Sequence, residues 1–274
     1  MNIFINIKNQ IKFKINTIKL LILSDKNYKI YGKQLELSQN LLFDCDINKQ
    51  NKSGNNLWIA FIEKDDEKVL SWSSQAISVL ISKINLQQQN QRGENFLMSM
   101  IRNSAMNNII LAENDWNYLI QNSDLQKKTD SNENVLMYGL KYQKNFSEKQ
   151  WDYLIENSKV TLINNQRENS LLMALRNREK LTLNDSQIQK IYNGLSYEIQ
   201  KETFLKLIHD PVKVYQKEIE FMIIKCNFEP HQWIINQLKN HQQKEILKII
   251  EKRNIEKKLE NNFNQEENTI KYKL

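Results

Sequence analysis

The sequence predicts an all-α solenoid of about five stacked helix-loop-helix repeats with a cap at each end. Two short motifs alternate along the chain, and each has the apolar spacing of a short amphipathic helix. The 274 residues include only five Gly and two Pro, too few turn residues for a many-stranded β fold. Because one short helix pair cannot bury its own apolar face, units that recur at regular intervals must stack on their neighbours.

The first motif predicts a short helix that begins just after an asparagine. Leu97, Met98 and Ile101 form one apolar stripe at i, i+1 and i+4, and the stripe recurs in the later copies. The asparagine ahead of the stripe can accept a hydrogen bond from a free N–H group of the first turn. Counted at Asn55, Asn95, Asn134, Asn169 and Thr203, the intervals between copies are 40, 39, 35 and 34 residues.

The second motif predicts the partner helix of each pair. Its clearest copies are NDWNYLIQNSDL around Trp116 and KQWDYLIENSKV around Trp151, with apolar residues at i, i+3 and i+4. Ser147 and Gln150 have the spacing of a capping box. Weaker copies surround Ile77, Ile188 and Ile219, and a fragment contains Leu41 and Leu42. Since both Trp residues share the register of these isoleucines, we expect them in the core between repeats.

The helix pair resembles a divergent ankyrin-type repeat, over about residues 34–230. A first helix that opens with Leu-Met in place of Leu-His and a second helix that ends in an NSDL-like segment carry the resemblance. The family's Thr-Pro helix start is absent, glycine remains in the turn only at Gly54 and Gly93, and most intervals exceed 33 residues. The unit is similar to LM…QWDYLI…NSDL repeats of intracellular bacterial symbionts. HEAT-like hairpins, the competing architecture, would need longer helices.

The resemblance implies a monomeric protein-binding module in the cytoplasm or delivered to a host cell. In the family, the connectors between repeats and the first helices form a concave binding surface. By register, the connectors lie near Gln50–Gly54, Gln89–Gly93, Lys127–Asn132 and Asn164–Arg167. Their residues differ between copies while the core residues repeat, so specificity is expected there. The candidate partner-binding residues are Trp72, Gln91, Arg92, Lys127, Lys128, Asn132, Gln166 and Arg167. Trp72 is out of register with the core, and local packing is its alternative role.

The two ends of the chain differ from the repeats. Residues 1–33 contain seven Lys and one acid, Asp25, and so carry most of the formal net charge of +7. We expect this basic segment to cap the first repeat; alternatively it is a targeting signal, or it contacts a membrane surface or nucleic acid with the repeats as scaffold. After Pro230, residues 231–258 predict two capping helices, and residues 259–274 predict a frayed polar tail.

The sequence offers no recognisable catalytic or metal-binding motif. GxxxxGK[ST], GxGxxG, GxSxG, HExxH and CxxC are all absent, and the three His lack metal-ligand spacing. We therefore expect no enzyme activity, cofactor, metal or small-molecule substrate. Cys45 and Cys226 occupy matching places in two copies of the second motif and are expected to be buried core thiols. No run approaches the roughly 20 apolar residues of a transmembrane helix.

Overall fold

The computed structural model describes residues 46–56, 59, 81–106, 111–142, 146–210, 215–240 and 244–271. Within these ranges every regular element is helical, apart from isolated β-bridges, so the predicted all-α class is confirmed. The basic segment 1–33, Trp72, Cys45 and the second-motif copies around Leu41 and Ile77 lie outside the described residues.

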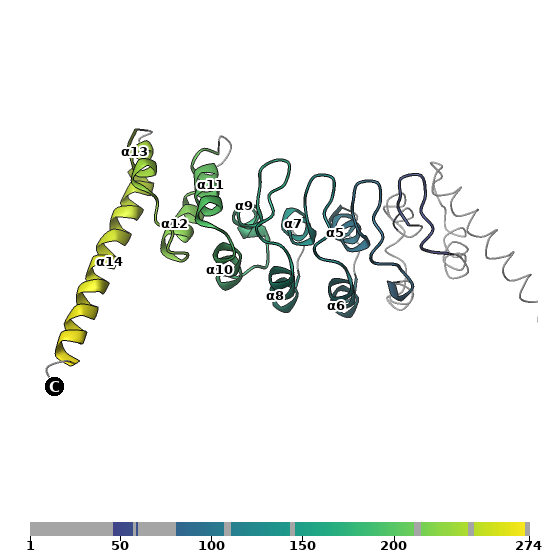
Figure 1. Ribbon diagram of the computed structural model, residues 1–274, viewed down its shortest axis with the longest axis horizontal. Coiled ribbons are helices and arrows are strands. Elements are labelled where there is room, and N and C mark those ends of the chain that lie inside the picture. The colour runs from purple at the N-terminus through teal and green to yellow at the C-terminus, as the bar shows by residue number, and fades with distance from the viewer. Residues whose placement is uncertain are drawn as a thin grey trace, which may run out of the picture.

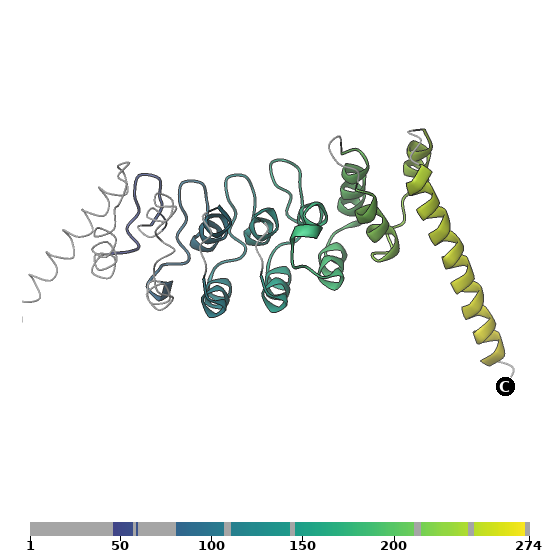
Figure 2. The ribbon, with the colours of Figure 1, turned by 180° about the vertical axis from the view of Figure 1, so that it is seen from behind.

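The helices form two parallel rows (Figure 1). The first row consists of α5 (Phe96–Met106), α7 (Val135–Lys141), α9 (Ser170–Arg176) and α11 (Tyr197–Ile208). The second row consists of α6 (Glu113–Asn122), α8 (Glu148–Asn157) and α10 (Asp185–Asn193), with α12 (Gln216–Ile224) following α11. Each helix packs on the next helix of its own row. Figure 2 shows the same rows from behind, with the connectors rising on the side of the first row away from the second.

The apolar stripes of both motifs meet between the rows. Leu97, Leu136 and Leu171 are fully buried at equivalent places in α5, α7 and α9. Trp116 and Trp151 are buried as predicted, and Phe146 packs edge-on against both rings, at centroid distances of 5.4 and 5.1 Å. This aromatic series joins α6 to α8 across the boundary between two units.

The cap asparagines also connect each first helix to the end of its partner helix. Asn95 Oδ1 accepts a hydrogen bond from Met98 N at 2.9 Å, which caps α5. Its Nδ2 donates at 3.1 Å to Asp124 O, just beyond the C-terminus of α6. Asn134 makes the equivalent pair of bonds, from Met137 N at 3.0 Å and to Lys159 O at 3.1 Å. An apolar residue at this position would lose both the cap and the link.

The predicted register of the first copy is wrong by one residue. Asn56, not Asn55, accepts from Ile59 N at 3.0 Å and therefore occupies the cap position. The first interval is thus 39 residues, from Asn56 to Asn95. Asn55 instead occupies the place of Glu94. Two adjacent asparagines fit the pattern equally well, and only the hydrogen bond separates them.

The last copy also departs from the prediction. Helix α11 begins at Tyr197, so Thr203 lies inside the helix and does not cap it. Thr203 Oγ1 nevertheless accepts from Asn169 Nδ2 at 2.8 Å and donates to Ile199 O at 2.9 Å. The Thr203 side chain therefore contacts the preceding unit although the local structure around it has changed.

Two helices follow the stack, α13 (Gln232–Asn240) and α14 (Lys244–Lys271). Helix α14 contacts α12 and α13, and its Ile246 and Ile250 are buried. The helix then extends away from the stack (Figures 1 and 2), where Ile255 and Leu259 are 60% and 61% exposed. It continues through most of residues 259–274, where the sequence predicts a frayed tail. No Gly or Pro interrupts this segment, so nothing in its backbone chemistry ends the helix earlier.

Candidate partner-binding surface

The described residues include four hairpin connectors, at residues 50–56, 89–95, 128–134 and 163–169, of which the last two link a described second helix to the next first helix. Isolated antiparallel bridges close three of them, Gln50–Asn56, Gln89–Asn95 and Ile163–Asn169. In the remaining one, Thr129 N donates to Glu133 O at 3.0 Å. Each hairpin has one residue with positive φ: Gly54, Gly93, Asn132 and Arg167, at 74°, 73°, 60° and 60°.

An asparagine three residues before the positive-φ residue organises the turn. Asn90 Oδ1 accepts from Arg92 N at 2.9 Å and from Glu94 N at 3.0 Å. Asn51 and Asn164 make the equivalent bonds, and Thr129 makes the bond to the fourth residue on. An asparagine side chain that bonds its own following backbone stabilises a turn. The recurring Asn-x-x-Gly spacing was available in the sequence but was not part of the prediction.

Neighbouring hairpins lie in direct contact. A Cβ atom on Gly93 would lie 2.9 Å from Thr129 Cα, too close for any side chain. The tips also share backbone hydrogen bonds, from Gln91 N to Ser53 O at 3.1 Å, from Asp130 N to Arg92 O at 3.0 Å and from Asn165 N to Ser131 O at 3.0 Å. The four tips therefore form one continuous ribbon with fixed spacing.

The structure places the predicted binding residues in three kinds of position. Gln91, Arg92, Gln166 and Arg167 are exposed at the tips. Lys127 and Lys128 lie on the arm before a tip, with Lys127 half-buried and Lys128 exposed at the place of Gln89.

Asn132 is partly buried, and its Nδ2 donates to Ile163 O of the next hairpin. It therefore holds the ribbon together, which is a structural role in addition to the predicted one.

The pair of tip residues ahead of the positive-φ residue differs from hairpin to hairpin, although its second member is Ser in two of them. The pairs are Lys52-Ser53, Gln91-Arg92, Asp130-Ser131 and Asn165-Gln166. The sequence candidates omitted Lys52, Asp130 and Asn165, which are exposed at equivalent places. A common register for the four hairpins, counted from the positive-φ residue, would have included them.

The first helices contribute less surface than predicted. All side chains from Val135 to Leu140 are buried, as are those from Leu171 to Leu175. In these two helices only the last turn reaches the surface, where Lys141 is exposed and Arg176 is partly exposed. Beside the hairpin tips, α7 and α9 therefore contribute only their basic last turns to the exposed face.

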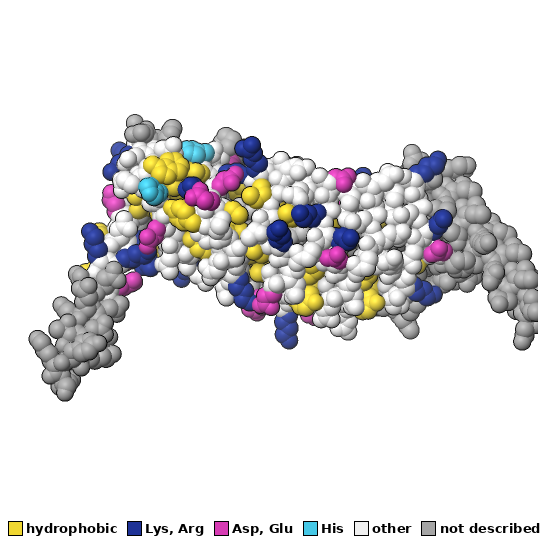
Figure 3. Space-filling view, in the orientation of Figure 1, with side chains coloured by type: hydrophobic (Ala, Val, Ile, Leu, Met, Phe, Trp, Pro, Cys, Tyr) yellow, Lys and Arg dark blue, Asp and Glu magenta, His cyan; other side chains and the backbone are white. Residues whose placement is uncertain are grey.

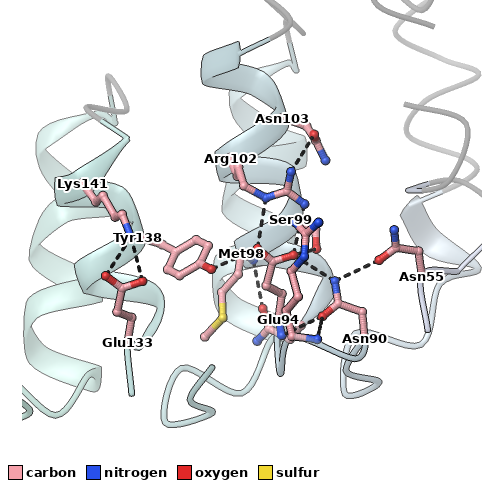
Figure 4. Close-up of polar contacts among 12 residues, drawn as sticks. Asn55, Asn90, Glu94, Met98, Ser99, Arg102, Asn103, Glu133, Tyr138 and Lys141 are labelled. Atoms are coloured by element: carbon pink, nitrogen blue, oxygen red, sulfur yellow. Dashed lines mark hydrogen bonds and ion pairs between the residues drawn. The ribbon is translucent and has the colours of Figure 1, made fainter. Parts of the chain in front are cut away.

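A buried carboxylate joins a hairpin to two helices (Figure 4). Glu94 Oε1 accepts from Arg102 Nε at 3.0 Å and from the Tyr138 hydroxyl at 2.9 Å. Its Oε2 accepts from Asn90 Nδ2 at 2.8 Å and from Arg102 Nη2 at 3.1 Å. Tyr138 belongs to α7 of the next unit, so the network couples neighbouring repeats.

The same ion pair recurs along the stack. Glu133 pairs with Lys141 at 2.9 Å, and Glu168 pairs with Arg176. Arg176 also contacts Asp210 of the next unit at 2.7 Å. In each pair the glutamate directly precedes the cap asparagine, and the basic residue follows the glutamate by eight positions. The prediction missed the pair because about two turns of helix separate the partners.

The network fixes the protonation states of its members. Burial alone would raise the pKa of Glu94, but the hydrogen bonds and charge of Arg102, with the bonds from Asn90 and Tyr138, outweigh it and lower the pKa below the usual 4.5. Burial and the neighbouring carboxylate raise the pKa of Tyr138. The adjoining cavity measures only about 10 Å³, room for about one water molecule.

We expect the free energy of unfolding to fall steeply as the pH drops below about 4.5. The pKa of Glu94 is lower in the folded chain than in the unfolded chain, so its stabilising effect is complete above the unfolded value of 4.5 and is lost as the pH falls toward the folded value. Glu94→Gln should reduce this slope, because the amide does not titrate. Urea unfolding between pH 7 and pH 3 measures how the free energy of unfolding changes with pH. Equal slopes for the unmodified protein and the Glu94→Gln variant would contradict the lowered pKa of Glu94.

Two further features of the described part are the state of its cysteine and the grouping of its potential metal ligands. Cys226 is buried as predicted, and burial raises the pKa of its thiol to about 12, the opposite of an activated nucleophile. Among the described residues, no three His, Cys, Asp or Glu side chains are grouped so as to hold a metal ion. The described helices also include none with the length and apolarity to cross a bilayer.

The surface differs along its length (Figure 3). Over α5 to α9 the visible face consists mainly of uncharged polar side chains and backbone, with charged residues standing singly. Hydrophobic side chains gather over α11 and α13, where Leu205, Ile208, Ile234 and Leu238 line a small crevice. The visible face over α5 to α9 is thus mainly polar, and the apolar area lies toward the C-terminal end, over α11 and α13.

A second cavity, of about 180 Å³, lies beside α14. Ile223, Phe228 and Ile250 line its apolar side, and Arg253 and Lys257 lie at its rim. Both cations already have partners, since Arg253 Nη2 donates to Asn227 Oδ1 at 2.8 Å and Lys257 pairs with Glu229.

Comparisons with known proteins give little beyond this geometry. No family model and no curated protein matches the chain. Among solved structures, one match is a chain of the complex between the predatory endopeptidase Bd0816 from Bdellovibrio bacteriovorus and immunity protein Bd3460. It is 16% identical, covers 64% of this chain and 96% of that chain, and has a TM-score of 0.29. A similarity of this size carries no inference about the function of this chain.

Proposed function

We propose that the chain is an ankyrin-like, non-catalytic module of about five repeats that binds another protein through its hairpin tips. The observation that carries the proposal is the ribbon of tips: its backbone is fixed by hydrogen bonds between hairpins, while its exposed side chains differ from tip to tip. A rigid frame with variable side chains provides specificity at a small entropic cost on binding. The resemblance to repeats of intracellular bacterial symbionts favours a protein of the host cell as the partner of this chain.

Affinity capture with the full chain tests this function. Gln91→Trp combined with Gln166→Trp enlarges two tips, and we expect the amount of retained partner to fall about tenfold, on the order of 1.4 kcal/mol. Lys149→Trp, on the exposed face of α8, is the matched control and should retain the partner. A discrete partner that both variants retain equally would contradict binding by the tips.

A second candidate function rests on the seven lysines of residues 1–33. This segment would attach the chain to an anionic membrane or to nucleic acid, with the repeats as scaffold. Lys12→Glu with Lys19→Glu should then abolish sedimentation with phosphatidylserine vesicles or retention on a polynucleotide, and added salt should weaken both. Binding that is indifferent to the substitutions and to salt would contradict this role.

A further inference from the structure

We propose that the partner of the hairpin tips presents an acidic protein segment. This inference rests on the proposed function and adds the chemistry of the partner. Four exposed cations lie on the hairpins, Lys52, Arg92, Lys128 and Arg167, against one exposed acid, Asp130. Within the described part of the chain, none of the four cations forms an ion pair.

The other acids of the hairpins are already neutralised. Glu94, Glu133 and Glu168 each pair with the basic residue at the end of the following first helix. Glu94 and Glu133 are also buried, so they present almost no carboxylate surface to a partner. The ribbon of tips is therefore electropositive even though its raw count of charged residues is balanced.

Acids gather on a different row of helices. The first turns of α6, α8 and α10 contain Glu113, Glu148 and Asp185, all exposed. An acid in the first turn is favoured by the helix dipole, so this placement also stabilises the helices. Asp185 pairs with Arg178 and the exposed Lys149 follows Glu148, so these first turns carry little net charge and an acidic partner is attracted mainly to the tips.

The composition of the hairpins favours an acidic protein over nucleic acid. None of the four hairpins contains Phe, Tyr or Trp, so they lack the aromatic surface on which single-stranded bases stack. The amides of Gln91, Asn165 and Gln166 can bond both carboxylates and peptide groups.

Fluorescence anisotropy with the full chain tests the inference. The probes are a labelled 20-residue peptide of Glu and Asp, a Lys-rich peptide of equal length and a 20-nucleotide oligo-dT. We expect the acidic peptide to bind, and its affinity to fall as NaCl rises from 50 to 300 mM. Arg92→Glu with Arg167→Glu should weaken binding about tenfold or more, which corresponds to about 1.4 kcal/mol. Lys12→Glu with Lys19→Glu makes the same charge change in the basic segment and should leave the affinity unchanged.

Three results would overturn the inference. They are a failure of the acidic peptide to bind, a loss of binding caused by the Lys12 and Lys19 changes but not by those at the tips, and tighter binding of oligo-dT that depends on Arg92 and Arg167. Circular dichroism confirms that each variant is folded.

Affinity capture of the partner with both sets of variants distinguishes a failure of this inference from a failure of the proposed function. If the Gln91→Trp and Gln166→Trp protein loses the partner while charge reversal and salt leave capture unchanged, the tips bind a partner that is not acidic. If neither the bulky nor the charged substitutions change capture, binding by the tips is itself wrong.

Discussion

Leu136→Ala is expected to lower the free energy of unfolding by about 2–5 kcal/mol. The side chain is 0% exposed, and α7 lies between α5 and α9, so neighbours on both sides limit how far the cavity can collapse. Urea unfolding followed by circular dichroism gives the value. Lys128→Ala, on an exposed hairpin arm, should change it by no more than about 0.5 kcal/mol. A loss for Leu136→Ala as small as that of the control would mean that the stripe does not fill the core between units.

Glu94→Ala is expected to cost about 3–5 kcal/mol, because it leaves the guanidinium of Arg102 without its carboxylate. The Arg102 side chain is only 11% exposed, and Tyr138 loses its acceptor in the same variant. Glu168→Ala removes the equivalent carboxylate from a pair in which both side chains are 28% exposed, and it should cost only about 1 kcal/mol.

Glu94→Ala and Glu168→Ala form a matched comparison, because they remove equivalent glutamates from two different repeats. Both glutamates occupy the same place in their hairpins and pair with an arginine eight residues later. They differ in burial and in partners, because Tyr138 also bonds Glu94 whereas Arg176 keeps Asp210 when Glu168 is removed. Equal losses of stability would contradict the conclusion that the Glu94 network is a buried connection between units. A larger loss for Glu168→Ala would contradict it more strongly.

Apolar periodicity was sufficient to predict most of the helices. The positions of buried residues in a helix repeat at a regular spacing that is visible in the sequence. The stripe at Leu97, Met98 and Ile101 and the register of Trp116 and Trp151 are such patterns. The capping box was predictable for the same reason, since its partners lie three residues apart; Gln150 Oε1 accepts from Ser147 N at 2.9 Å.

Features that depend on contacts between units were not predictable in this way. Residues 55 and 56 are both asparagine, so the sequence does not show which of them caps the following helix. Only the hydrogen bond from Ile59 N identifies Asn56 as the cap residue. Thr203 keeps its contact with Asn169 although the helix around it starts earlier, which no local pattern indicates.

The abundance of Asn and Gln has a structural role that composition alone did not reveal. Gln126 Nε2 donates to Asn157 O at 2.6 Å, and Gln87 Nε2 donates to Asn122 O at 3.1 Å, so both reach the next unit. Side-chain amides can donate to backbone carbonyl groups while accepting elsewhere, and they occur here where successive units meet. Their bonding partners lie more than thirty residues away, so no local pattern in the sequence indicates these contacts.

Cross-linking from single positions tests the central claim, that the hairpin tips contact the partner, most directly. A benzophenone amino acid is placed at Gln91 or Gln166 on the tips, at Glu156 on the second row of helices, or at Asn9 in the basic segment, and each protein is irradiated with the captured partner. Binding by the tips predicts covalent adducts from positions 91 and 166 and none from position 156. Adducts from position 9 or 156 with none from the tips would contradict it.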